Sequence, residues 1–143
     1  MRYLLILFVA LLPGIVKAET LPTLAAAKEV TNKAMTMIAG NDLEGGLKLL
    51  KPYLVIPPAE FDVMLGQATM QLPAMGQRFG NSVGKEFIRE DKVGESLVRF
   101  IFIQKFEKTV TRWLFFYYKS PSGWVLNTFT YDDSFQLLFP IGG

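Results

Sequence analysis

The sequence predicts an α+β fold in which three N-terminal helices pack on a curved antiparallel sheet of about four strands. Two observations lead to this prediction. Residues 20–73 carry apolar side chains at helical spacing, whereas residues 83–132 are rich in β-branched and aromatic residues. The connections between the predicted strands are short, and short connections favour antiparallel pairing.

The first 18 residues have the pattern of a cleavable secretory signal peptide. Arg2 supplies a positive charge, residues 4–12 form an unbroken apolar run, and short side chains at Val16 and Ala18 suit a cleavage site. The run is far shorter than the ~20 residues that span a bilayer. We therefore expect an exported, periplasmic protein with one domain over residues 19–143. After removal of the signal peptide, we expect that it is not an integral membrane protein. An uncleaved interfacial anchor is the alternative.

The composition excludes several kinds of chemistry. The chain has no cysteine and no histidine, so it lacks disulfides, thiol nucleophiles, the usual zinc ligands and a histidine general base. Loss of Arg2 and Lys17 with the signal peptide leaves 13 basic and 13 acidic residues. Because nucleic-acid binding needs a surplus of basic residues, we expect no nucleic-acid partner. We also expect no cofactor, no metal and no catalytic residue.

Capping and breaking residues predict the helix boundaries. The first helix is expected to begin at Thr20 or Thr23 and to stop at Gly40. Asp42 is suited to cap the second helix. In that helix Gly45-Gly46 lowers helix propensity and allows a neighbouring element to approach closely.

A third helix is expected to open at Pro57-Pro58 and to end at Pro73, because proline starts helices well but interrupts their interior. Four strands follow it. They are expected at residues 83–90, 95–106, 111–119 and 124–132.

The turn at residues 120–123 predicts the register of the last two strands. Its sequence, Ser-Pro-Ser-Gly, fits a type I turn followed by a bulge at Gly123, which would pair Ser120 with Trp124. The register then predicts these cross-strand pairs: Arg112 with Asp132, Trp113 with Tyr131, Phe115 with Phe129, and Tyr117 with Asn127. The first of them is an opposite-charge pair, which supports the register.

Both faces of the predicted sheet are apolar in the middle. One face is expected to carry Trp113, Phe115, Tyr117, Phe129 and Tyr131, and the opposite face Leu114, Phe116, Tyr118 and Leu126. Helices cover one face, so the second is expected to meet a partner subunit, a ligand or another protein. Wrapping by the curvature of the sheet itself is the alternative.

Six residues of these strands are candidates for ligand binding: Trp113, Tyr117, Asn127, Tyr131, Arg112 and Asp132. Several would place polar groups on an apolar face, which is the usual form of a small-molecule site. A structural role is the alternative, with the tyrosine hydroxyls at the rim and Asn127 bonded to the backbone. Asp132 and Asp133 should point to opposite faces, so that Asp132 pairs with Arg112 and Asp133 caps residues 134–139.

The order of the elements resembles the NTF2-like (cystatin-like) superfamily of cone-shaped α+β domains. A local likeness to small exported bacterial proteins of that superfamily lies in residues 94–97, 105–108, 112–113, 116–119, 123–127 and 129–133. The resemblance implies a pocket between the helices and the concave sheet, and a dimer through the outer sheet face. Enzymatic members place an Asp, often with His, in the pocket, and this chain has no His.

We therefore expect an exported binding or interaction module that holds a small apolar or amphipathic ligand or a protein partner, with a homodimer through the sheet face as one such pairing. Two alternatives remain open. One is an Asp- and Tyr-dependent enzyme of the isomerase or dehydratase type. The other is a non-catalytic, homodimeric, envelope-associated structural protein.

Overall fold

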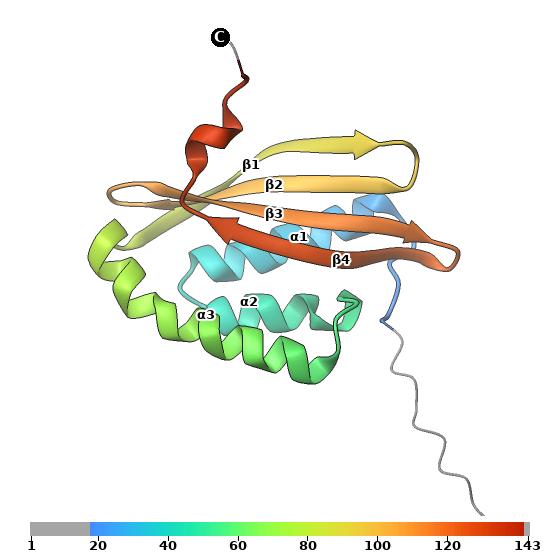
Figure 1. Ribbon diagram of the computed structural model, residues 1–143, viewed down its shortest axis with the longest axis horizontal. Coiled ribbons are helices and arrows are strands. Elements are labelled where there is room, and N and C mark those ends of the chain that lie inside the picture. The colour runs from blue at the N-terminus through green and yellow to red at the C-terminus, as the bar shows by residue number, and fades with distance from the viewer. Residues whose placement is uncertain (1–17, 142–143) are drawn as a thin grey trace, which may run out of the picture.

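Helices and strands form two layers. The computed structural model describes residues 18–141, so the predicted signal peptide, apart from Ala18, lies outside the described residues. Three α-helices precede a four-stranded antiparallel sheet with the strand order β1-β2-β3-β4. All three helices lie on one face of this sheet (Figure 1). The predicted α+β fold is therefore confirmed.

The helices begin where capping residues predict. Their bounds are α1 (Leu24–Ala39), α2 (Leu43–Leu50) and α3 (Pro58–Phe79), with a short 3-10 helix, η1 (Lys51–Tyr53), after α2. The Thr23 side chain accepts a hydrogen bond from the backbone N–H of Ala26 at 3.0 Å, and Asp42 accepts one from Gly45 at 2.8 Å. These bonds satisfy N–H groups that have no partner within the helix. No helix among the described residues is long and apolar enough to cross a membrane.

The third helix is longer than the sequence predicts. Pro73 lies inside α3, which continues to Phe79. A proline there removes one backbone hydrogen bond and strains the preceding turn. The last turn nevertheless stays helical, because Phe79 is buried and its ring lies 5.4 Å from the ring of Phe106. Tertiary packing at the end of α3 thus outweighs the local cost of the proline.

The strands pair in chain order. Their bounds are β1 (Ser82–Val93), β2 (Leu97–Phe106), β3 (Val110–Ser120) and β4 (Gly123–Asp132), and a 3-10 helix, η2 (Phe135–Leu138), follows β4. Residues 91–93 were expected to be turn material, but they extend β1 and pair with residues 97–99. The β1–β2 turn is therefore tighter than the sequence indicates.

The β3–β4 hairpin has the predicted register over its first half. From Arg112 to Phe116 every predicted cross-strand pair is present. Nε and Nη2 of Arg112 lie 2.7 and 2.9 Å from the two carboxylate oxygens of Asp132. The hydrogen bonds from Arg112 hold the pKa of Asp132 below its usual value.

The second half of this hairpin is displaced by one residue from the prediction. Ser120 pairs with Gly123, so the turn has two residues. The bulge that the sequence predicts at Gly123 lies at Asn127 instead. Tyr117 consequently pairs with Leu126. The predicted register would have turned Leu126 away from the helices, whereas the observed one buries it and leaves Asn127 exposed. Burial of a leucine in place of an asparagine explains the shift.

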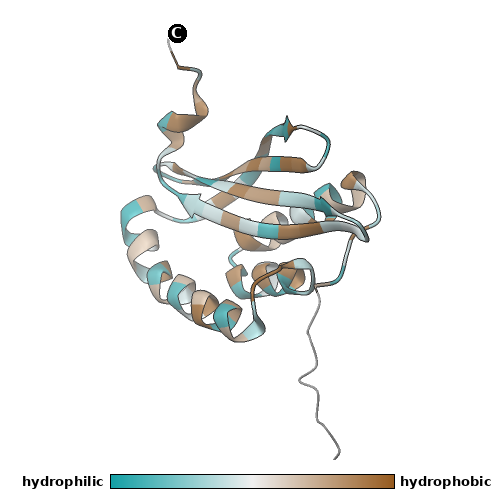
Figure 2. Cartoon of the chain, turned by 45° about the vertical axis from the view of Figure 1, so that its right-hand side comes forward, coloured by the Kyte–Doolittle hydropathy of each residue, from teal (hydrophilic) through white to brown (hydrophobic). Residues whose placement is uncertain are grey.

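The hydrophobic core lies between the helices and the inner face of the sheet. Figure 2 shows hydrophobic residues along the central strands and on the helices beside them. The largest fully buried side chains of the sheet are Trp113, Tyr117, Phe100, Phe102 and Phe115. On the helical side Met35, Leu47 and Leu50 pack against them.

Two glycines provide a test of the helix packing. A Cβ atom at Gly46 of α2 would lie 2.6 Å from Cγ1 of Ile38 and 2.7 Å from the backbone oxygen of Ala34, both in α1. We expect Gly46→Ala to lower the free energy of unfolding by about 2 kcal/mol, because the two helices would have to separate. A Cβ at Gly66 of α3 meets nothing within 4 Å, so Gly66→Ala should stabilise the protein by up to ~1 kcal/mol. Urea denaturation measures the free energy of unfolding of both variants. Equal values for Gly46→Ala and Gly66→Ala would contradict the close α1–α2 contact.

Candidate functional site

A cavity of about 180 Å³ opens at one end of the molecule, between the inner face of the sheet, the end of α3 and the α1–α2 connection. We call it the Trp113 cavity. Its apolar wall consists of Ile38, Leu43, Leu72, Met75, Phe106 and Trp113. Its polar side chains are Asn41, Asn81, Ser82, Gln104 and Tyr131. None of the residues that line it is charged.

Two sharp changes of chain direction shape the mouth of this cavity. Asn41 follows α1 with a φ of 68°, a left-handed conformation that asparagine tolerates better than most residues. Gly80 follows α3 with a φ of 83°. A Cβ atom at Gly80 would lie 2.6 Å from Oε2 of Glu107, so only glycine fits where α3 turns into β1.

Gln104 is the buried polar group at the β2 side of the cavity. Its Nε2 donates a hydrogen bond to Oγ of Ser82 at 3.0 Å, and the Ser82 hydroxyl donates in turn to the backbone oxygen of Ala39 at 2.8 Å. These bonds orient the amide group. No hydrogen bond from a described residue reaches Oε1 of Gln104, so this oxygen can accept one from a ligand.

Trp113 supplies a second free polar group. Its side chain is 1% exposed, and its indole Nε1 has no hydrogen-bond acceptor among the described residues. Oγ1 of Thr111, two residues earlier in β3, is also buried and unpaired. A buried donor without a partner costs about 1–3 kcal/mol and is rare in folded proteins. The Trp113 N–H is therefore an unsatisfied donor on a residue that lines the cavity.

Tyr131 connects the cavity wall to α3. Its ring stacks on Trp113 with 4.5 Å between ring centroids and 16° between the planes. Its hydroxyl donates a hydrogen bond to Oε1 of Gln71 in α3 at 3.0 Å. Burial raises the pKa of Tyr131, so its hydroxyl stays protonated and remains a donor at neutral pH.

The structure separates the four candidate residues that the sequence predicts on one face of the sheet. Trp113 and Tyr131 lie together and line the cavity. Tyr117 is buried in the core, where its hydroxyl lies 2.7 Å from Oγ1 of Thr31. Asn127, which the sequence placed beside Tyr117, is exposed at the β4 bulge.

The other two candidate residues lie on the outer face of the sheet. Arg112 and Asp132 form their ion pair there, and Oδ1 of Asp132 also accepts a hydrogen bond from the backbone N–H of Ser134 at 2.9 Å. Asp133 was expected to cap this C-terminal turn. It pairs instead with Arg78 at 3.3 Å, and the 3-10 helix η2 begins after Ser134 without a side-chain cap.

Sequence reasoning missed two polar residues that line the cavity and one that bonds to its wall. Gln104 and Ser82 come from two strands, and Gln71 comes from α3. Gln104 did carry a signal, since it is a polar residue directly after the apolar run of residues 100–103. Ser82 and Gln71 carried none, because their roles depend on contacts with residues 22 and 60 positions away.

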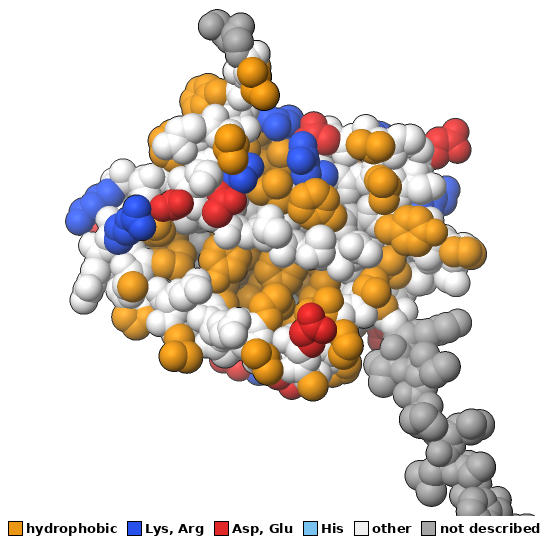
Figure 3. Space-filling model, viewed as in Figure 1, with side chains coloured by type: hydrophobic (Ala, Val, Ile, Leu, Met, Phe, Trp, Pro, Cys, Tyr) orange, Lys and Arg blue, Asp and Glu red, His pale blue; other side chains and the backbone are white. Residues whose placement is uncertain are grey.

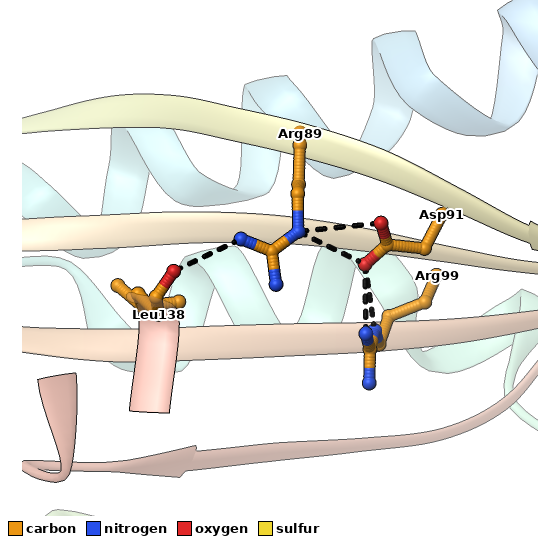
Figure 4. A network of polar contacts seen from close by, with 4 residues as sticks. All are labelled: Arg89, Asp91, Arg99 and Leu138. Atoms are coloured by element: carbon orange, nitrogen blue, oxygen red, sulfur yellow. Dashed lines mark hydrogen bonds and ion pairs between the residues drawn. The ribbon is translucent and has the colours of Figure 1, made fainter. Parts of the chain in front are cut away.

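The outer face of the sheet is partly covered by the chain itself. Carboxylate oxygens of Asp91 accept hydrogen bonds from both Arg89 and Arg99, the shortest being 2.7 Å from Nη2 of Arg99 (Figure 4). Hydrogen bonding from Arg99 is the main cause of the lowered pKa of Asp91. Nη1 of Arg89 donates to the backbone oxygen of Leu138 at 3.2 Å, which ties η2 to this face.

Four apolar side chains of this outer face are buried although none of the three α-helices lies over it. They are Ile101, Ile103, Leu114 and Val125. Two large apolar side chains at one end of the sheet, Leu97 and Tyr118, remain exposed. The chain thus covers much of the second apolar face by itself.

No group of three or more metal-ligating side chains occurs within residues 18–141.

No protein-family model matches the chain, and comparisons with curated proteins and with solved structures find no match. The α+β fold and the geometry of the Trp113 cavity are therefore the basis for a functional assignment.

Proposed function

We propose that this protein binds a small, uncharged and largely apolar molecule in the Trp113 cavity. The observation that carries this proposal is a mostly apolar cavity lined by Trp113, whose buried N–H has no acceptor among the described residues. An apolar pocket with a few convergent polar groups is the usual form of a small-molecule site.

The size and charge of the cavity define the ligand. A cavity of about 150 Å³ admits a molecule the size of benzene, so 180 Å³ accommodates one ring or a short chain. A charged ligand would lose its hydration without gaining an opposite charge, because no lining residue is charged. A hydroxyl suits the site best, since it can accept a hydrogen bond from Trp113 and donate one to Gln104.

The architecture supports an NTF2-like assignment within this proposal. Three helices precede a four-stranded sheet and lie on one of its faces, and the cavity lies between the two layers. That is where the resemblance to the NTF2-like superfamily implies a pocket. Export to the periplasm, which rests on the signal-peptide pattern of residues 1–18, is part of the same proposal.

The geometry favours binding over catalysis. An Asp-dependent enzyme needs a carboxylate in the cavity, and none lines it. Asp132 is on the outer face and is bonded to Arg112. The Tyr131 hydroxyl donates a hydrogen bond to Gln71, and burial raises its pKa, so the deprotonated form that could act as a base is not populated at neutral pH.

Substitution of Trp113 tests the proposal. We expect the purified protein to bind phenol, a one-ring hydroxyl compound, and Trp113→Phe to weaken this binding about three- to tenfold, because the N–H is lost while an aromatic ring is retained. Isothermal titration calorimetry measures the affinities. Trp124→Phe is the matched control, since Trp124 is buried but does not line the cavity. Absence of phenol binding, or equal affinities for the Trp113 variant and the wild type, would contradict the proposal.

A further inference from the structure

The outer edge of β4 is only partly covered by the rest of the chain. β4 is the last strand in the order β1-β2-β3-β4, so one of its edges is open in the sheet. Near its start, Leu21 and Trp124 exchange two backbone hydrogen bonds of 2.8 Å, and the N–H of Val55 donates to the oxygen of Leu126 at 3.1 Å. Beyond Leu126, no described segment other than β3 forms a backbone hydrogen bond with β4.

Alternation along the hairpin identifies the open backbone groups. In an antiparallel pair, the backbone groups of alternate residues point towards the partner strand and away from it. Leu126, opposite Tyr117, points its oxygen away from β3. Phe129 is opposite Phe115, which lies two residues from Tyr117 in β3, so the N–H and C=O of Phe129 also point away from β3. No described residue forms a hydrogen bond with either group outside the sheet. An open strand edge of this kind is a template for pairing with another chain.

A second cavity, of about 280 Å³, adjoins the open part of this edge. We call it the Phe129 cavity. Its apolar wall consists of Leu54, Ile56, Val63, Met64 and Phe129. Figure 3 shows hydrophobic side chains gathered at the surface between β4 and α3. The Phe129 cavity shares no lining residue with the Trp113 cavity, so the two are separate sites.

One charged residue lines the Phe129 cavity. It is Glu60, which is exposed in the first turn of α3. The nearby carboxylate of Asp62 is paired with Lys51 at 3.1 Å, whereas Glu60 forms no ion pair with a described residue. A partner with a basic side chain at this rim is therefore favoured over one with an acidic side chain.

We propose that the open edge of β4 binds an extended peptide as an added strand. The peptide backbone forms hydrogen bonds with the N–H and C=O of Phe129, an apolar side chain enters the Phe129 cavity, and a basic side chain lies beside Glu60. The chain itself supports this choice of occupant, because Leu54 and Val55 already pair with β4 along the same edge. The peptide continues that row of hydrogen bonds. This site does not depend on the function proposed for the Trp113 cavity.

A short synthetic peptide tests the backbone pairing. The probe is acetyl-Lys-Val-Thr-Val-Lys-amide, followed by nuclear magnetic resonance on the purified protein. We expect saturating peptide to slow hydrogen exchange of the Phe129 amide at least tenfold, because that N–H gains an acceptor. The Trp124 amide is the internal control, since it already donates to Leu21 and should not change. An unchanged exchange rate at Phe129 would overturn the inference.

Two further outcomes separate strand pairing from other kinds of contact. The same peptide N-methylated at every residue keeps its side chains but loses its backbone donors, and it should bind more than tenfold more weakly. Equal binding of the two peptides would show that side chains alone suffice, which overturns the added strand. Protection of Phe129 without peptide, together with dimerisation in analytical ultracentrifugation, would show that a second copy of the chain occupies the edge and would also overturn the inference.

The charge at the rim is tested by exchanging the lysines of the peptide for glutamates. We expect the acidic peptide to bind about two- to fivefold more weakly than the basic one, because the pairing with Glu60 is solvent-exposed. This preference should disappear in Glu60→Gln. Glu95→Gln is the matched control, because Glu95 is exposed in the β1–β2 turn and lines neither cavity. A preference that survives in the Glu60 variant would overturn the placement of the basic side chain.

Discussion

Replacement of Phe115 by alanine is expected to lower the free energy of unfolding by about 4 kcal/mol. Phe115 is fully buried at the centre of the inner sheet face. Its ring centroid lies 6.0 Å from that of Phe102, 6.2 Å from that of Trp113 and 6.0 Å from that of Phe129. These rings are themselves packed on strands and helices, so they cannot collapse into the space that the substitution leaves.

Phe116→Ala is the matched control for this prediction. Phe116 is the next residue in β3, lies on the outer face and is only partly buried. Its ring is 5.9 Å from the guanidinium carbon of Arg99. We expect a loss of about 1 kcal/mol, because the side chain already contacts solvent. Urea denaturation followed by circular dichroism measures both variants. Equal losses would contradict the assignment of the inner face as the main core.

Stability is expected to fall above pH 10 through the ionisation of Tyr117. Burial raises the pKa of Tyr117 from 10.0 to about 12. The fold therefore favours the neutral phenol, so this contribution to stability is complete below pH 10 and is lost as the pH rises towards 12. For a pKa difference of about 2 units, the loss is about 1.4 kcal/mol at pH 11 and about 2 kcal/mol at pH 12.

The position of Tyr117 explains why its ionised form is unfavourable. Its hydroxyl lies 2.7 Å from Oγ1 of Thr31 in α1, and the Thr31 hydroxyl donates to the backbone oxygen of Ala27 at 2.7 Å. Thr31 has one hydroxyl proton, so Tyr117 must be the donor in their bond. Loss of the Tyr117 proton would break the hydrogen bond between β3 and α1 and leave a charge in the core.

Tyr117→Phe isolates this effect from other groups that titrate at alkaline pH. The variant should be about 1 kcal/mol less stable than the wild type near pH 7, because it lacks one buried hydrogen bond. Near pH 11 the difference should disappear or reverse, since only the wild type loses stability through this hydroxyl. Denaturant unfolding of both proteins at the two pH values checks the prediction. A difference that stays constant with pH would contradict it.

Part of the candidate site could be predicted from sequence because it depends on local patterns. Alternation along a strand groups Trp113 with the aromatic residues of one sheet face, and the predicted register, which the Arg112–Asp132 pair supports, sets Tyr131 beside it. The predicted pairing of Asn127 with Tyr117 was wrong, because a bulge can lie at several positions along a hairpin. Its position was decided by the burial of Leu126 against the helices, which a pairing rule does not include.

The sequence by itself determined the fold class, the cap of α2, two candidate caps for α1, and the grouping of the aromatic side chains on one sheet face, because these follow from periodicity and from residues a few positions apart. Only the tertiary structure decided that α3 continues past Pro73, because Phe79 gains its stabilisation from Phe106 on another element. The cavity has the same origin. The cavity exists because the continued helix lies opposite Gln104 and Trp113. Contacts between segments far apart in the sequence stabilise that arrangement, and local helix propensity does not include such contacts.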